Sequence, residues 1–153
     1  MIRETIAQSL KEAMKAKDEP KTTTIRMVNA AIKQKDIDVA RPRGDQQIGE
    51  DEVLNLLQSL IKSRRESIVL YEQGGRQDLV AKENAEIAII EQFLPKQMGE
   101  DETRAAIQEI VASLGASSVK DMGKVMAALK SKYAGQLDMT KASAAVKDVL
   151  AGK

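Results

Sequence analysis

The chain has 153 residues, of which 42% are apolar and 31% charged, and its 24 basic and 23 acidic side chains leave a net charge of +1. It contains no cysteine and no histidine, and only three of its residues are aromatic. These absences exclude disulfides, thiolate metal sites, catalytic triads that use histidine, and an aromatic platform for single-stranded nucleic acid. The balanced charge argues against a strong general attraction to polyanions.

Apolar residues recur every three or four positions over most of the N-terminal half, which is the spacing of helices that bury one face. Pro95 is predicted to end this half, because the residue before a proline avoids helical angles. The predicted segments are, in chain order, a helix over residues 2–14, a helix that begins near Pro20, a loop over 38–49, a helix from Glu50 to Gly74, and a helix over about 78–93.

After Pro95 the composition changes, since residues 97–153 hold 11 of the 20 alanines. Three shorter helices are predicted there, over about 100–114, 119–133 and 139–151. The predicted fold is therefore all-α. An N-terminal helical bundle of about four helices, residues 1–96, precedes a small three-helix C-terminal domain, residues 97–153.

Neither the ends nor the middle of the chain indicate a membrane protein. Residues 1–4 include an acid and no apolar core of a signal peptide, and the longest apolar run, 87–90, has four residues. We expect a cytoplasmic protein without membrane association.

The sequence gives little support for catalytic or metal-binding residues. The acidic triplets 50–52 and 100–102 both follow a glycine and suit the first turns of helices, where carboxylates favour the helix dipole. Adjacent helical residues point apart, so three consecutive carboxylates do not converge on a metal. No phosphate-binding glycine loop and no supported serine–lysine pair occurs. We therefore predict no catalytic residue, no bound metal and no cofactor.

Two arginine-rich sites have two interpretations each. Arg64–Arg65 falls on a predicted helix and Arg41–Pro42–Arg43 in the predicted loop. Both are explained by solvated surface, and both are also compatible with phosphate contacts, because guanidinium matches phosphate geometry.

The segment from residue 118 to 133 carries the main candidate site. Ser118 is predicted as a helix N-cap with Asp121 as its capping partner. At 100° per residue, Met122 and Met126 lie on an apolar face, while Lys120 and Lys124 lie opposite. Lys130 and Lys132 flank these lysines, and residues 116–153 hold seven lysines against three aspartates.

Gly123 lies within this predicted helix, where glycine costs about 1 kcal/mol relative to alanine. A close approach by another backbone or by a ligand would explain that cost. For the lysine face itself, solvated surface is the alternative interpretation.

Four segments of the chain resemble the YqeY family, whose members are small bacterial proteins similar to the tail domain of GatB, a component of the tRNA-dependent amidotransferase. The resemblance rests on residues 25–33, 75–80, 93–98 and 120–126, of which the last is the most specific. Two positions depart from the pattern. Gly99 stands where many relatives have Ser or Thr, and Gln136 stands in a turn where many relatives have arginine.

The resemblance implies a helical bundle with a small helical C-terminal domain, and it implies tRNA or a translation-related protein as partner. We expect a non-catalytic tRNA-binding or tRNA-associated accessory protein that contacts phosphates through Lys120, Lys124, Lys130 and Lys132. A helical protein-interaction adaptor without RNA binding is the alternative. The family is also labelled with glutamine-dependent carbon–nitrogen ligase activity, but the amidase and the catalytic core of GatB that carry that chemistry have no counterpart in this sequence.

Overall fold

The computed structural model describes residues 1–152, and Lys153, the last residue of the predicted second domain, lies outside this range. The described chain contains helices and no strand, which confirms the all-α prediction. It divides into two compact units, Met1–Leu94 and the residues from Pro95 onward. The α-helices are α1 (Ile2–Lys15), α2 (Glu19–Lys35), α3 (Glu50–Gln73), α4 (Gln77–Glu91), α5 (Glu100–Leu114), α6 (Met122–Lys132) and α7 (Met139–Leu150).

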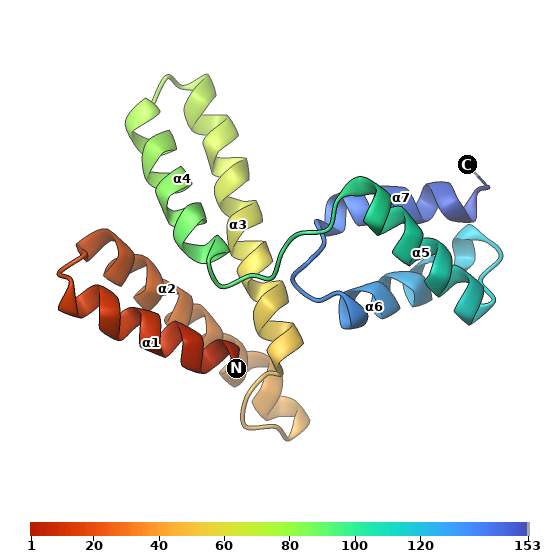
Figure 1. Cartoon of the computed structure of the whole chain (residues 1–153), viewed down its shortest axis with the longest axis horizontal. Helices are drawn as coiled ribbons and strands as arrows, with labels where there is room; N and C mark the ends of the chain where they lie inside the picture. The colour runs from red at the N-terminus through yellow and green to blue at the C-terminus, as the bar shows by residue number, and fades with distance from the viewer. Residues whose placement is uncertain (153) are drawn as a thin grey trace. The chain divides into compact units, whose positions relative to one another are not determined.

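The first unit is built from two helical hairpins, α1–α2 and α3–α4 (Figure 1). Helix α2 contacts both α1 and α4, so it joins the two hairpins. Both hairpins contribute fully buried side chains to one shared core, among them Ile6, Ile25, Leu57 and Ile90. The predicted apolar stripes therefore do form the core of this unit.

The turn between α1 and α2 holds a residue in an unfavourable backbone conformation. Lys17 has a φ of 56°, in the left-handed region that glycine adopts without steric cost. Its amide donates to Met14 O at 3.2 Å, and the amide of Asp18 donates to Ala13 O at 3.0 Å. These two bonds close the end of α1 in the pattern that usually places glycine at this position. Asp18 then caps α2 by accepting a hydrogen bond from the Lys21 amide.

The predicted loop over residues 38–49 is shorter in the structure, so that prediction is wrong for its first part. Helix α2 continues as the π-helical turn η1 (Asp36–Ala40) and the 3-10 turn η2 (Arg41–Arg43). Pro42 does not prevent this, because a proline fits the first turn of a helix. Gly44, with a φ of 93°, ends the helical stretch and leaves a loop over 44–49.

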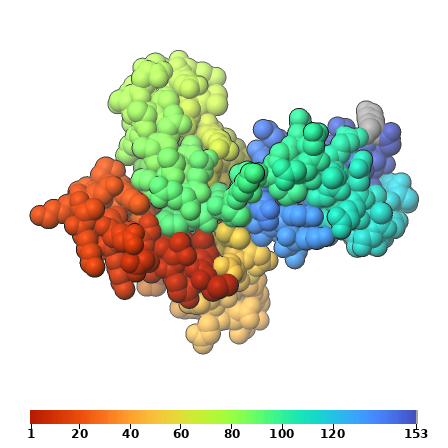
Figure 2. Space-filling model, viewed as in Figure 1, coloured from red at the N-terminus to blue at the C-terminus, as the bar shows by residue number. Residues whose placement is uncertain are grey.

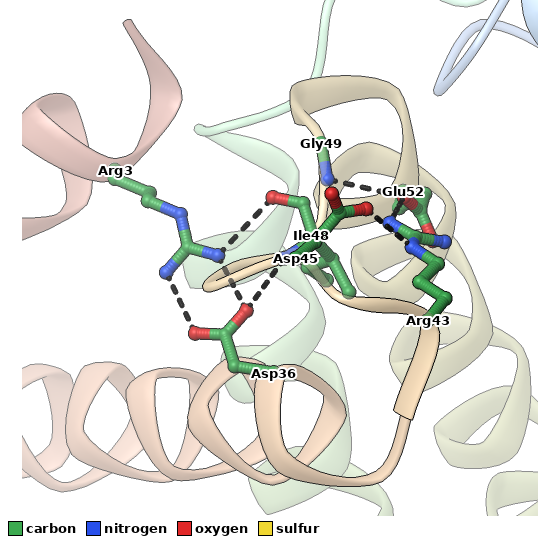
Figure 3. Close-up of polar contacts among 7 residues, drawn as sticks. All are labelled: Arg3, Asp36, Arg43, Asp45, Ile48, Gly49 and Glu52. Carbon is green, nitrogen blue, oxygen red and sulfur yellow. Dashed lines mark hydrogen bonds and ion pairs between the residues drawn. The ribbon is translucent and has the colours of Figure 1, made fainter. Parts of the chain in front are cut away.

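Asp36 fixes this segment to the rest of the unit (Figure 3). Its carboxylate accepts hydrogen bonds from Arg3 Nη2 at 2.7 Å and from the Ile48 amide at 2.8 Å. Only 8% of Asp36 is exposed. Burial alone would raise the pKa of this carboxyl, but the hydrogen bonds from Arg3 and Ile48 hold the pKa below its usual value. One buried acid thus ties α1, the end of α2 and the loop together.

The second unit packs α5, α6 and α7 around its own core, and α5 contacts both of the other helices. Ile107, Val125, Leu129 and Val146 are fully buried there. The residues before α5 are attached to this unit as well, since the Met98 amide donates to Gln136 O at 2.8 Å. Small as it is, the second unit has a continuous apolar core.

Candidate nucleic-acid interface

The candidate interface lies on α6 and on the short 3-10 turn η3 (Val119–Asp121) that precedes it. Val125 and Leu129 are fully buried in the core of the second unit, and Met122 and Met126 pack against that core. This packing fixes the rotation of α6 about its axis. The lysines that alternate with these apolar residues are consequently held at the surface.

The lysines of this surface differ in their surroundings. Lys120, Lys124 and Lys130 are exposed, and none has a carboxylate within ion-pair distance among the described residues. Lys132 instead lies 3.4 Å from Glu109 Oε1 on α5, and its Nζ sits 5.6 Å from the centre of the Tyr133 ring. Three of the four predicted contact residues are therefore available to an anion, whereas Lys132 has a partner within the chain.

Ser118 and Asp121 form a different start of the helix from the predicted capping pair. Ser118 is the N-cap residue of η3, but its side chain makes no capping hydrogen bond. The Asp121 carboxylate accepts from the Ser117 amide at 3.0 Å and not from the residue that it was expected to cap. The reason is geometric, because the first turn is a tighter 3-10 turn and α6 begins only at Met122.

Gly123 is exposed on α6, and a methyl group added at its Cα would meet no atom within 4 Å. No neighbouring segment of the described chain therefore requires glycine at this position. Its φ is also not in the left-handed region. The helix-propensity cost of Gly123 thus has no explanation within the described part of the chain.

Residues 135–138, which form the turn before α7, make contacts within the second unit. Gly135, with a φ of 76°, accepts a hydrogen bond from the Gln97 side chain at its carbonyl, and Leu137 is 2% exposed. Asp138 caps α7 by accepting from the amides of Thr140 and Lys141. This turn, where Gln136 stands in place of arginine, therefore orders α7 and attaches the residues before α5.

The arginine sites in the first unit bind carboxylates of the chain itself. Arg64 is 15% exposed and its Nε lies 3.0 Å from Glu86 Oε2, while Arg65 pairs with Glu91 at 3.0 Å. Arg43 pairs with Asp45 and Glu52 (Figure 3). These contacts hold α3 against α4 and close the 44–49 loop. They explain Arg43, Arg64 and Arg65 without a phosphate ligand, whereas Arg41 is exposed and has no carboxylate within ion-pair distance in the described chain.

An open hollow of about 550 Å³ lies in the first unit, lined by residues of α1, by Lys21 of α2 and by the two residues that follow α4. The surfaces of the N-terminal helix, red, and of the α4 region, green, lie side by side in Figure 2. Most of the residues that line the hollow are polar, among them Glu4, Glu12, Lys21 and Gln92, and Phe93 adds an apolar wall. Glu12 is engaged by the side-chain amide of Gln8 at 3.2 Å. Nothing in this lining pairs a nucleophile with a base. Within residues 1–152, no group of three or more acidic side chains is placed to hold a metal ion.

A sequence comparison links this two-unit helical chain to a known family. The sequence pattern of the family described as Yqey-like protein matches residues 3–150, nearly the whole chain. The chain belongs to the YqeY family. The four segments 25–33, 75–80, 93–98 and 120–126 all lie within the match.

Curated relatives of this YqeY chain share its sequence over part of their length. "Altered inheritance of mitochondria protein 41, mitochondrial" of Eremothecium gossypii is 39% identical over 89 residues, which are 58% of this chain and 46% of the relative. The protein of the same name from Kluyveromyces lactis is 40% identical over 88 residues, which are 58% of this chain and 45% of the relative. The matched region is thus less than half of these relatives.

These relatives correct the expected localisation. They are named as mitochondrial proteins, so the prediction of a cytoplasmic protein is wrong. That prediction depended on the lack of membrane and secretion signals, which cannot distinguish one aqueous compartment from another. In the described part of the chain, no helix has both the length and the apolar character needed to cross a bilayer.

Proposed function

We propose that this YqeY protein is a non-catalytic accessory protein that binds tRNA, and that its second unit contacts tRNA phosphates through Lys120, Lys124 and Lys130. The observation that carries the proposal is the state of these three lysines. They are exposed and have no carboxylate partner among the described residues. Lys124 and Lys130 project from α6, whose rotation is fixed by the buried Val125 and Leu129, and Lys120 lies on the preceding turn η3. Lys132 has a smaller role in the proposal, because Glu109 already lies within ion-pair distance of it.

The surroundings of the lysines support recognition by shape. The exposed Gly123 and Ala127 lie among them and present almost no side chain. A sugar–phosphate backbone could therefore approach α6 closely, while the lysines contact phosphates on either side. Folded RNA is commonly recognised in this way, through its backbone and its shape. The family resemblance is to bacterial proteins and the relatives carry mitochondrial names, so tRNA of a bacterial or mitochondrial translation system is the first ligand to test.

The test measures tRNA affinity of the full chain at several salt concentrations. For Lys120→Glu/Lys124→Glu we expect affinity to fall at least tenfold at low salt. The slope of log K against log salt should flatten by about 1.5, since each neutralised phosphate contributes roughly 0.7 to 0.9 to that slope. The fold should persist, because both side chains are exposed.

The matched control is Lys141→Glu/Lys147→Glu, which makes the same change in net charge on the exposed side of α7 in the same unit. This control should bind with little change in slope. If both double variants behave alike, or if the native chain does not bind tRNA, the proposal is wrong.

The second candidate function is a helical protein-interaction adaptor. One observation favours it: Val69 and Leu70, near the end of α3, are 52% and 66% exposed. Two large apolar side chains at the surface of one helix are a modest contact area for a partner helix. Binding to a partner protein that is lost in Leu70→Ser and retained in Lys120→Glu/Lys124→Glu would favour the adaptor. The ligase label of the family finds no support in the hollow described above.

A further inference from the structure

The first unit divides its charges unequally between its two hairpins. Residues 1–35, which contain α1 and α2, hold eight basic and four acidic side chains. Residues 50–94, which contain α3 and α4, hold five basic and nine acidic side chains. The α1–α2 hairpin is therefore basic and the α3–α4 hairpin acidic, although the net charge of the whole chain is close to zero.

The two hairpins also differ in how their cations are used. All three arginines of the α3–α4 hairpin are paired with carboxylates, namely Arg64, Arg65 and Arg76. In the α1–α2 hairpin, Arg3 is paired with Asp36. The remaining seven cations of residues 1–35 have no carboxylate within ion-pair distance in the described chain: Lys11, Lys15, Lys17, Lys21, Arg26, Lys33 and Lys35.

Arg26 and Lys33 on α2 are the centre of this basic surface. They are seven residues apart, which places them on one face of the helix and about 10 Å apart along its axis. Both are exposed. Asn29 and Ala30 lie between them, and the Asn29 side-chain amide has no hydrogen-bond partner within residues 1–152. Arg26 Nη2 lies 4.0 Å from Met14 Sδ, so this face of α2 borders the end of α1.

The composition of this face indicates which anion it fits. Arginine, lysine and asparagine side chains are typical contacts of phosphate and sugar groups in nucleic acids. A membrane-binding helix would present bulky apolar side chains, and a protein interface would present aromatic anchors. Residues 1–35 contain no aromatic residue, and no exposed large apolar side chain lies between Arg26 and Lys33. The exposed large apolar side chains nearby are Met14 on α1 and, beyond the end of α2, Ile37 and Val39 of η1.

We propose that the face of α2 formed by Arg26, Asn29 and Lys33 is a second phosphate-contact surface for RNA, located in the first unit and separate from the lysines of α6. This inference rests on the proposed function in that tRNA is taken as the ligand. It adds that the first unit contributes its own contacts with the RNA backbone.

The experiment titrates deacylated bulk tRNA into the full chain across a series of salt concentrations. In Arg26→Glu/Lys33→Glu, affinity should fall roughly tenfold at low salt and the slope of log K against log salt should flatten by about 1.5. The matched control, Lys62→Glu/Lys82→Glu, places the same charge change on exposed lysines of the acidic hairpin that have no ion pair in the described chain. It should leave the slope nearly unchanged. Circular dichroism of each variant checks that the helices are retained.

The outcomes separate this inference from the proposed function. If Arg26→Glu/Lys33→Glu binds like the native chain while Lys120→Glu/Lys124→Glu is weakened, the α2 surface is refuted and the α6 site stands. If Arg26→Glu/Lys33→Glu is weakened while Lys120→Glu/Lys124→Glu binds like the native chain, the α2 surface is supported and the α6 site is refuted. If the native chain does not bind tRNA, both fail. Binding to phosphatidylserine vesicles that depends on Arg26 and Lys33, with tRNA binding unaffected, would also overturn the RNA assignment.

Discussion

Asp36 is the residue whose role depends most on the three-dimensional structure. It is an acidic side chain in a segment that looks like the frayed end of a helix, yet it is buried and bonded to Arg3 and Ile48. A buried carboxylate with partners from two distant segments contributes far more than an exposed ion pair. Removing its charge should therefore loosen α1, the end of α2 and the 44–49 loop at once.

We expect Asp36→Asn to lower the free energy of unfolding by about 1–2 kcal/mol at pH 7. The pKa of Asp36 is depressed in the folded chain, so its contribution is complete above the unfolded pKa and disappears as the pH falls through the folded value. The difference between the native chain and the variant should accordingly be constant above about pH 4 and shrink below it. Urea unfolding over a range of pH measures this.

Asp45→Asn provides the control for that series. Asp45 pairs with Arg43, but the two side chains are 57% and 42% exposed, so the loss should stay below about 1 kcal/mol. Equal losses in the two variants, or a difference that does not decline in acid, would contradict the role assigned to Asp36.

Among the helices, α6 both packs against the core of the second unit and presents the lysines of the proposed interface. Its buried side supplies Val125 and Leu129 to the core, and its exposed side presents the lysines. Gly123 contributes neither to the core nor to the charge of this surface. It weakens the helix, and no atom of the described chain lies within 4 Å of the position where a Cβ would stand. A ligand that approaches the backbone of α6 is the remaining explanation under the proposed function.

The substitution Gly123→Ala should therefore act in opposite directions on stability and on binding. The added methyl group meets no neighbour in the chain, so the second unit should become more stable by up to about 1 kcal/mol. The same methyl group should weaken tRNA binding severalfold, because it would separate the RNA backbone from the helix. Thermal unfolding and tRNA titration measure the two effects, and Ala127→Ser, which alters the same face with little added volume, is the control. Unchanged or tighter tRNA binding would remove Gly123 from the proposed interface.

Over the chain as a whole, the residues at the start of the second unit are held by unequal numbers of hydrogen bonds. Gln97 and Met98 are hydrogen bonded to the turn of the second unit, through Gly135 and Gln136, whereas Lys96 is exposed and unpaired in the described structure. The 44–49 loop also lacks regular structure, but it follows helical turns, and the side chain of the adjacent Arg43 is paired with two carboxylates.

Limited digestion of the full chain with trypsin should therefore cut first after Lys96 and later after Arg43, since exposed and weakly bonded segments are cleaved first. Mass spectrometry of a time course identifies the sites, and Lys96→Gln should delay the first cleavage. An early cut within residues 53–70, in the middle of α3, would contradict the description of the first unit as a compact body.

The helices could be predicted from the amino-acid sequence, because their apolar spacing and their end signals are local. The stripe from Ile25 to Ile32, the glycines after α3 and Pro95 place helices close to those of the structure. The same periodicity placed Lys120 and Lys124 opposite Met122 and Met126, as the burial of α6 requires. The prediction of one capping pair, Ser118 with Asp121, was wrong because the length of a first turn is not fixed by residue types alone.

Only the tertiary structure shows which charged residues form ion pairs. Lys132 and Lys124 look alike in sequence, but Glu109 of α5 reaches only the first. In the sequence, Arg64 and Arg65 of α3 are compatible with phosphate contacts, but in the structure α4 brings Glu86 and Glu91 beside them. Asp36 likewise pairs with Arg3, which is 33 residues away in the chain. Helical periodicity is set by neighbours within a few residues, whereas ion pairing depends on which distant segments the core brings together.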